Sequence, residues 1–149
     1  MRDFYQKNNM NIKFIAEAGV NHNGKISTAK KLIKVAAGAG ADFIKFQAFK
    51  TDSLIIKGTK KAIYQEKNTV SNEDQFQMLK KLEFSEEEFK VLIKECKKNK
   101  IKFLLSVFDE ESLKVIIKLG LKIIKIPSGE INNYFLLSKL AKLKLKIIL

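Results

Sequence analysis

The sequence predicts an α/β protein built on a parallel sheet. Short apolar runs rich in Ile, Phe, Val and Leu alternate with longer segments whose apolar residues recur at helical spacing. Glycine follows helical segments, as at Gly38 and Gly120, where it is expected to end them. This alternation is typical of parallel strands joined by helices. By itself it fits a (β/α)₈ TIM barrel and a doubly wound sheet equally well.

The expected strands are short apolar runs, at residues 11–16, 41–49, 101–106, 121–126 and 144–149. The expected helices lie between them, at residues 27–37, 75–82, 86–98, 110–119 and 132–143. Ser85 and Glu88 have the spacing of a capping box at the start of one helix. Residues 50–74 are too long for an ordinary connection, and such segments are usually functional or disordered. We therefore expect about five βα units in residues 12–149, after an N-terminal tail at residues 1–11.

Composition narrows the class of protein. The 149 residues are 46% hydrophobic and 30% charged, as in a globular domain, and no apolar stretch approaches the roughly 20 residues of a membrane helix. The polar N-terminus does not resemble a signal peptide, and Cys96 is the one cysteine and has no disulfide partner in the chain. We therefore expect a cytoplasmic protein with no membrane partner, and a buried structural thiol at Cys96.

The net charge of +13 raises the question of nucleic-acid binding. Arg2 is the only arginine, although arginine is the residue best suited to phosphate and guanine contacts. The positive excess is also nearly equal in residues 1–75 and 76–149. A diffuse lysine coat is more often a solvated surface, so we expect no nucleic-acid partner, although the coat can steer anionic substrates.

Polar side chains recur where the predicted strands end. Glu17 lies at the end of the first, Lys45 and Gln47 near the end of the second, and Ser106 at the end of the third. Lys125, Ser128 and Glu130 lie at or just past the end of the fourth. Parallel strands bring these ends together, and in such folds the chemistry lies there. Two lysines and a serine suit a phosphate and a carboxylate, whereas two glutamates suit sugar hydroxyls or proton transfer. A single lysine would more often be a surface side chain.

The loop after the first strand holds weaker candidates. His22, the only histidine, is about as consistent with a loop-bracing hydrogen bond as with catalysis. Asn21 and Asn23 are better explained as turn residues. Ser128 and Gly129 follow Pro127, and they form either a tight turn or a site where backbone N–H groups face an anion.

Several short motifs, taken in order, closely resemble the N-acetylneuraminate (sialic acid) synthase family, which includes the legionaminic acid synthases. The motifs span nearly the whole chain and are IAEAGVNHNG (15–24), IKFQ (44–47), AIYQ (62–65), QMLKKL (77–82) and KIPSGE (125–130). The pseudaminic acid synthases are similar but usually differ around the Ser-Gly-Glu stretch. One departure from the family is Val107, which replaces a proline after Ser106 and weakens the expected contact from the third strand.

The resemblance implies a (β/α)₈ barrel followed by a small antifreeze-like domain. It also implies condensation of phosphoenolpyruvate with an open-chain N-acetylated amino sugar, such as N-acetylmannosamine or a 2,4-diacetamido sugar, in a homodimer that uses Mn²⁺ or Mg²⁺. By this resemblance Lys45, Lys125 and Ser128 hold phosphoenolpyruvate, and Glu17 and Glu130 contact the sugar or the tetrahedral intermediate. The same comparison adds substrate contacts at Gln47, Ser106 and Tyr64.

The resemblance also implies that these residues are only part of the enzyme. A complete barrel needs roughly 250 residues, and in the family histidines on later strands hold the metal, so no metal ligand is assigned in this chain. We expect the 149 residues alone to be inactive and to self-associate. Two other hypotheses remain: an aldolase-type or other phosphosugar barrel that forms a Schiff base on lysine, and a lysine-rich nucleic-acid binder.

Overall fold

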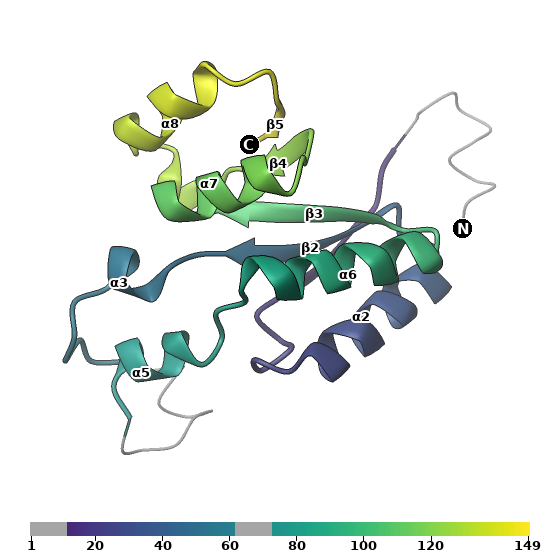
Figure 1. Ribbon diagram of the computed structural model, residues 1–149, viewed down its shortest axis with the longest axis horizontal. Coiled ribbons are helices and arrows are strands. Elements are labelled where there is room, and N and C mark those ends of the chain that lie inside the picture. The colour runs from purple at the N-terminus through teal and green to yellow at the C-terminus, as the bar shows by residue number, and fades with distance from the viewer. Residues whose placement is uncertain (1–11, 62–72) are drawn as a thin grey trace.

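The computed structural model describes residues 12–61 and 73–149, which form a five-stranded parallel sheet (Figure 1). The strands stand side by side in chain order, as β1 (Ile15–Gly19), β2 (Phe43–Ala48), β3 (Lys102–Val107), β4 (Ile123–Lys125) and β5 (Lys146–Ile148). A doubly wound sheet reverses its strand order at a switch point, whereas a barrel adds each strand beside the one before. The uninterrupted order confirms the barrel class, with about five βα units.

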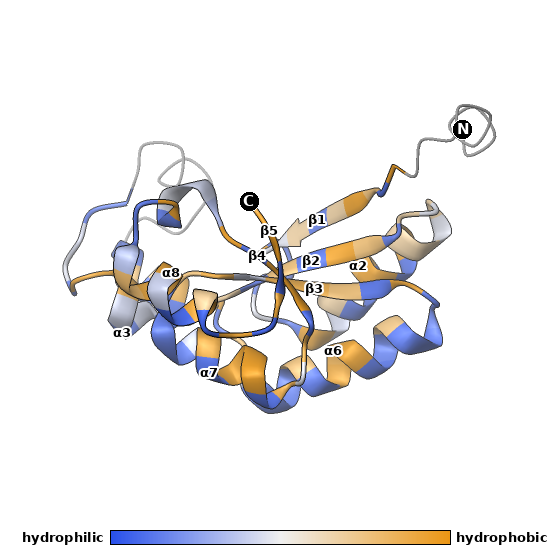
Figure 2. Cartoon of the chain, turned by 90° about the horizontal axis from the view of Figure 1, so that it is seen from above, coloured by the Kyte–Doolittle hydropathy of each residue, from blue (hydrophilic) through white to orange (hydrophobic). Residues whose placement is uncertain are grey.

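Helices cover one face of the sheet (Figures 1 and 2). These helices are α2 (Ile26–Gly38), α6 (Glu86–Lys98), α7 (Glu110–Lys118) and α8 (Tyr134–Ala141), with a 3₁₀ turn, η1 (Ser128–Glu130), before α8. The short helices α3 (Thr51–Leu54) and α5 (Gln75–Lys80) lie beyond the ends of the strands (Figure 1). The core lies between this face and the helices, where strand residues Phe46, Leu105 and Ile124 meet helix residues such as Ile33 and Phe89. Burial of this apolar surface is the main force that holds the layers together.

The register of the strands determines which side chains share the other face, here called the inner face. Lys45 pairs with Glu17 on one side and with Leu104 on the other, and Ser106 pairs with both Gln47 and Lys125. Paired residues in adjacent strands point to the same face, and side chains alternate along each strand. The predicted residues that lie within the strands are therefore gathered on the inner face, opposite the helices: Glu17, Lys45, Gln47, Ser106 and Lys125.

The strand boundaries differ from those expected. The first strand begins at Ile15 and not at residue 11, and it runs to Gly19, so Glu17 lies within β1 and not beyond its end. The fourth and fifth strands have only three residues each. Their expected first residues belong to turns, because Leu121 N–H donates to Ile116 C=O and Leu145 N–H to Leu143 C=O.

The helix predictions agree more closely with the structure. Ser85 and Glu88 form the expected capping box at the start of α6. A second capping box, formed by Asp74 and Gln77, begins α5 and was not predicted. Cys96 is buried as expected, and burial raises the pKa of its thiol to about 12. In the part of the chain that is described, no helix is long and apolar enough to cross a membrane.

Candidate functional site

Three side chains from neighbouring strands meet on the inner face, and we call them the strand-end cluster: Glu17 of β1, Lys45 of β2 and Ser106 of β3. Lys45 Nζ donates a hydrogen bond to Ser106 Oγ (3.1 Å) and forms an ion pair with the Glu17 carboxylate. The Lys45 side chain is only 12% exposed, whereas that of Glu17 is 52% exposed. A lysine so nearly buried needs such partners, because an unpaired charge away from water is costly.

The cluster has polar and open surroundings. A side chain at Gly19 would begin 3.3 Å from Glu17 Oε1 and 3.6 Å from Gln47 Nε2, and the φ angle of Gly19 is +50°. Gly19 therefore leaves room beside the end of β1 for the Glu17 carboxylate and the Gln47 amide. Its positive φ angle is one that other residues adopt less readily. Gln47 thus lies beside the cluster, as expected from its place at the end of β2.

Lys125 extends this arrangement to β4. It pairs with Ser106 across the strands, and its Nζ donates to the Ile126 carbonyl (2.6 Å). Val107, which replaces the family's proline, is buried and pairs with Ala48, so β3 continues past Ser106. The sheet thus places Lys125 directly opposite Ser106, while Lys45 reaches Ser106 from β2 through its ammonium group. An anion with several oxygens can bind at such a place, because ammonium groups and a hydroxyl all donate to it.

The remaining predicted residues lie outside the strand-end cluster. Ser128 and Glu130 are in η1, where Ser128 is exposed and Glu130 Oε2 accepts from Asn133 Nδ2 (2.8 Å). The Glu130 backbone N–H donates to Pro127 C=O, so that group is not free to bind an anion. Tyr64 lies outside the described residues, as does the tail at residues 1–11.

His22 braces the loop after β1. Its Nδ1 accepts from Gly24 N–H (3.1 Å), and its ring stacks on Phe84 with 4.0 Å between ring centres. Burial lowers the pKa of His22 to about 4, and the nearby Glu88 carboxylate opposes that effect only in part. A neutral, buried ring with an occupied nitrogen fits the loop-bracing role better than proton transfer.

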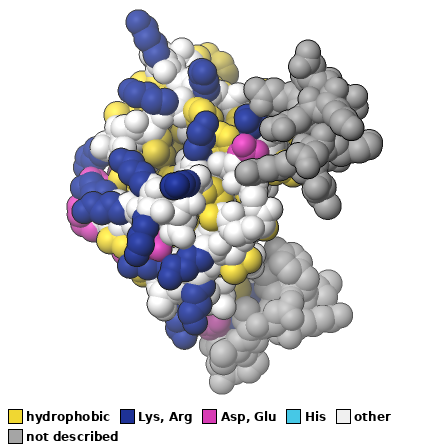
Figure 3. Space-filling view, turned by 90° about the vertical axis from the view of Figure 1, so that its right-hand side faces the viewer, with side chains coloured by type: hydrophobic (Ala, Val, Ile, Leu, Met, Phe, Trp, Pro, Cys, Tyr) yellow, Lys and Arg dark blue, Asp and Glu magenta, His cyan; other side chains and the backbone are white. Residues whose placement is uncertain are grey.

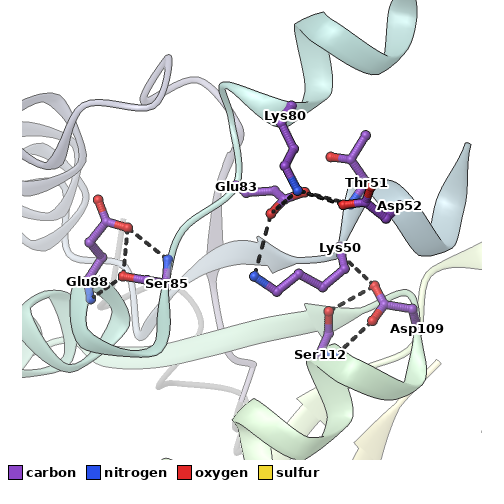
Figure 4. Close-up of polar contacts among 9 residues, drawn as sticks. All are labelled: Lys50, Thr51, Asp52, Lys80, Glu83, Ser85, Glu88, Asp109 and Ser112. Carbon is purple, nitrogen blue, oxygen red and sulfur yellow. Dashed lines mark hydrogen bonds and ion pairs between the residues drawn. The ribbon is translucent and has the colours of Figure 1, made fainter. Parts of the chain in front are cut away.

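A polar network that the sequence analysis missed fixes the connections that follow the strands (Figure 4). Asp109 is the N-cap of α7, where its carboxylate accepts from Ser112 N–H (2.8 Å) and Ser112 Oγ (2.9 Å). The same carboxylate accepts from the backbone N–H of Lys50 (2.7 Å), just after β2. One buried side chain thereby ties the end of β2 to the end of β3. Its position before Glu110 and Glu111 was a recognisable cap signal.

Glu83 makes the second tie in this network (Figure 4). It accepts from the backbone N–H of Thr51 (2.7 Å) and from Lys80 Nζ (3.2 Å), and Lys50 Nζ lies 3.5 Å away. Burial alone would raise the pKa of Glu83, but the bonds from Thr51 and Lys80 outweigh it and hold the pKa below its ordinary value. No local pattern reveals this role, because Thr51 and Glu83 are far apart in the sequence.

The described residues do not fit a divalent-metal site. Within residues 12–61 and 73–149, no three His, Cys, Asp or Glu side chains are grouped so that they could hold a metal ion. His22 is engaged by Gly24 and Phe84, and Glu17 by Lys45. Metal chemistry is therefore assigned to none of these side chains.

Comparison with known proteins gives a consistent result. The sequence model of the NeuB family matches residues 32–149. The N,N'-diacetyllegionaminic acid synthase of Campylobacter jejuni is 56% identical over 135 residues, which are 91% of this chain and 40% of that protein. The enzyme of the same name from Legionella pneumophila is 47% identical over 135 residues, covering 91% of this chain and 38% of that protein.

Solved structures agree. The N-acetylneuraminic acid (sialic acid) synthetase of Leptospira borgpetersenii, determined in complex with citrate, has a TM-score of 0.74 and 32% identity, over 91% of this chain and 43% of that one. This chain therefore spans about 40% of the length of the relatives that it matches.

Proposed function

Because the chain belongs to the NeuB family, we propose that it contributes the phosphoenolpyruvate site of a sialic-acid-type synthase. The reaction condenses phosphoenolpyruvate with an open-chain N-acetylated amino sugar, a 2,4-diacetamido sugar or N-acetylmannosamine, to give a nine-carbon 2-keto acid and phosphate. The observation that carries the proposal is the strand-end cluster, in which Lys45 is held between Glu17 and Ser106 on the inner face. The enzyme is then a transferase.

The lysines are proposed to bind the anionic substrate. Phosphoenolpyruvate carries a phosphate and a carboxylate, and Lys45 and Lys125 supply ammonium groups from β2 and β4 with Ser106 between them. Ser128 adds a hydroxyl from η1, and Gln47 an amide. Charge-assisted hydrogen bonds from several directions fix both the position and the orientation of such a substrate.

The glutamates are proposed to bind the sugar. The enol carbon of phosphoenolpyruvate attacks the sugar aldehyde, water adds to the resulting cationic carbon, and phosphate leaves by cleavage of the C–O bond. Glu17 is half exposed beside Lys45, so its carboxylate can accept hydrogen bonds from sugar hydroxyls. Glu130, whose carboxylate accepts from Asn133 in the turn after β4, is proposed to make a similar contact. The family's divalent metal has no fitting ligand set among the described residues, so no step is routed through it.

Two further expectations belong to this proposal. The free, buried thiol of Cys96 suits a reducing compartment, which supports a cytoplasmic location. The homodimer of the family is proposed for the assembled enzyme.

The test joins this chain to the rest of the Campylobacter jejuni relative, beginning after the position that aligns with Leu149. We expect the joined protein to release phosphate from phosphoenolpyruvate when the amino sugar and Mn²⁺ are present. Lys125→Ala should lower kcat/KM by at least about a hundredfold, because a charge-assisted bond to the substrate is lost. Lys31→Ala removes an exposed lysine in the middle of α2 and should leave the rate unchanged.

Two comparisons complete the test. The 149 residues alone should release no phosphate, because their inner face is open and water is not excluded from the cluster. Treatment with pyruvate and borohydride tests the aldolase-type alternative. An aldolase-type enzyme forms a Schiff base between pyruvate and a lysine, and borohydride traps it as a covalent adduct. Such an adduct on Lys45 or Lys125, or equal rates for Lys125→Ala and Lys31→Ala, would contradict the synthase proposal.

A further inference from the structure

Positive charge is concentrated at the end of the sheet where the strands begin. In the α/β alternation, the turns that lead from each helix to the next strand all lie at this end. It carries exposed lysines, which we call the basic end: Lys97, Lys100, Lys102, Lys122, Lys144 and Lys146. Figure 3 shows this side of the molecule, with lysines spread over it and few carboxylates in view. The positive charge, which is evenly distributed along the sequence, is thus unevenly distributed over the surface of the folded molecule.

These lysines lack the neutralising partners found elsewhere. In residues 12–61 and 73–149 none of them forms an ion pair, whereas Lys90 and Lys114 pair with glutamates of the first helical turns. In the described helix-to-strand turns the one carboxylate is Asp42, which is already bound by Lys13 and by Phe14 N–H. The helix dipole accounts for a cation in the last turn of α6, but not for cations at the starts of β3, β4 and β5.

An apolar hollow of about 330 Å³ opens among these cations. Phe43, Cys96, Phe103, Leu121 and Ile123 are among the residues that line it. Three of the basic-end lysines also border the hollow, and they are Lys97, Lys102 and Lys122. The ammonium group of Lys102 lies 5.4 Å from the centre of the Phe43 ring, so cation and apolar surface are in direct contact at the hollow.

We propose that the basic end binds an acidic polypeptide segment that carries one bulky apolar side chain. The apolar side chain enters the hollow and supplies most of the affinity, as a buried anchor residue does at other interfaces. Carboxylates on either side of it pair with the lysines and orient the segment. This site lies at the opposite end of the sheet from the strand-end cluster, so the proposal does not depend on the enzymatic one.

Two other anionic partners fit less well. A membrane surface is bound by apolar groups that protrude into it, whereas the apolar groups among these lysines line a recess. A nucleic acid favours arginine forks and exposed aromatic rings, but the basic end contains lysine alone, and Phe43 is 8% exposed. The recess and the cations together favour the polypeptide.

The test measures fluorescence anisotropy of two labelled peptides with the full 149-residue chain. One peptide is Glu-Glu-Glu-Phe-Glu-Glu-Glu, and the other has Ser in place of Phe. We expect the Phe peptide to bind at least tenfold more tightly, and both affinities to fall as salt is added. Because the two peptides carry the same charge, their ratio reports the hollow without altering the protein.

Charge reversal tests the lysines. The triple variant Lys97→Glu, Lys122→Glu, Lys144→Glu should weaken the Phe peptide at least tenfold. The control triple Lys25→Glu, Lys31→Glu, Lys60→Glu makes the same change in net charge outside the basic end. It should weaken binding of the Phe peptide less than twofold. Circular dichroism checks that both triple variants are folded. Equal affinity for the two peptides, equal loss in the two triples, or tighter binding to single-stranded RNA or to anionic vesicles would each overturn the proposal.

Discussion

The Lys45 ammonium is shared between two oxygen partners, Glu17 and Ser106, so any anion that binds Lys45 competes with both of them. Lys45 is nearly buried, so its interactions are screened by water less than those of the surface lysines. Glu17 is the more exposed partner and has room to turn away, because Gly19 leaves space beside it. A phosphate that approaches Lys45 therefore competes with Glu17, and the displaced carboxylate is then free to accept other hydrogen bonds.

His22 allows a pH-dependent prediction at the residue scale. Burial keeps the folded His22 neutral down to about pH 4, whereas the unfolded residue binds a proton near pH 6.5. Between these values the unfolded state binds more protons, so the free energy of unfolding falls as the pH is lowered. We expect it to fall by about 2 kcal/mol more between pH 6.5 and pH 4.5 in the wild type than in His22→Asn, at about 1.4 kcal/mol per pH unit.

The His22→Asn variant is suitable because the Asn side-chain oxygen can still accept from Gly24 N–H. Urea denaturation at several pH values measures the free energy of unfolding of both proteins. The free energy of the wild type should fall more steeply toward acidic pH than that of the variant. Parallel pH profiles for the two proteins would show that His22 does not titrate on unfolding and would contradict the interpretation of its burial.

At this scale the sequence was informative about which residues are polar at strand ends, but not about their partners. The placing of Lys45, Gln47 and Ser106 followed from strand patterns. The pairing of Lys45 with both Glu17 and Ser106 did not, because it depends on strand register, which no local pattern specifies. His22 stayed ambiguous for the same reason, since its stacking partner Phe84 is distant in the sequence.

The connections after β2 and β3 behave as one unit at the element scale. Asp109 holds the start of α7 and the Lys50 backbone, and Glu83 holds the Thr51 backbone next to it (Figure 4). Both carboxylates accept from backbone N–H groups, which are otherwise costly to leave unpaired away from water. The network therefore fixes the loops that follow two strands of the strand-end cluster.

Asp109→Ala should be more destabilising than loss of an ordinary helix cap. The cap itself is worth about 1 kcal/mol, and the unpaired Lys50 N–H adds about 1–2 kcal/mol, so we expect a loss of about 2–3 kcal/mol. Ser85→Ala, at the exposed cap of α6, is the matched control and should cost about 1 kcal/mol. Urea denaturation measures both, and equal losses would mean that Asp109 does not couple the two connections.

Helices were predicted more closely than strands because their ends carry local chemical signals. The capping box of Ser85 and Glu88 marks α6 within the sequence itself. The ends of β4 and β5 depend instead on where the neighbouring strand stops pairing and on the turn that closes the preceding helix. A strand boundary is therefore a property of the sheet, and an apolar run overestimates its length.

At the scale of the whole molecule, charges that are evenly distributed along the sequence are unevenly distributed over the surface. Acidic residues cluster in the first turns of α6 and α7, and lysines follow the helices. Because all the strands are parallel, these local preferences add up at opposite ends of the sheet. Counting the charges in each half of the sequence predicted a diffuse lysine coat. The count missed the uneven distribution because each half of the sequence contributes residues to both ends of the sheet.

The edges of the sheet lead to the last prediction. Among the described residues, β1 and β5 each pair with one strand only, so each leaves unpaired backbone groups. Exposed apolar side chains accompany them, with Ile15 at 36% and Ile147 at 42% exposure. Open edges with apolar neighbours are templates for pairing with another chain. We therefore expect the 149-residue chain to form dimers or larger species as its concentration rises, which light scattering after size exclusion measures.

Single substitutions identify the surface responsible. Ile147→Lys places a charge on the edge strand β5 and should shift the association to at least tenfold higher concentration, because an edge lysine opposes strand pairing. Ile56→Lys makes the same change at a residue that is 83% exposed but lies in no strand, and it should have little effect. The joined protein with the rest of the Campylobacter jejuni relative should associate less through these edges, since added strands would pair with them. A chain that stays monomeric at every concentration, or one that both substitutions dissociate equally, would show that the strand edges are not what holds the copies together.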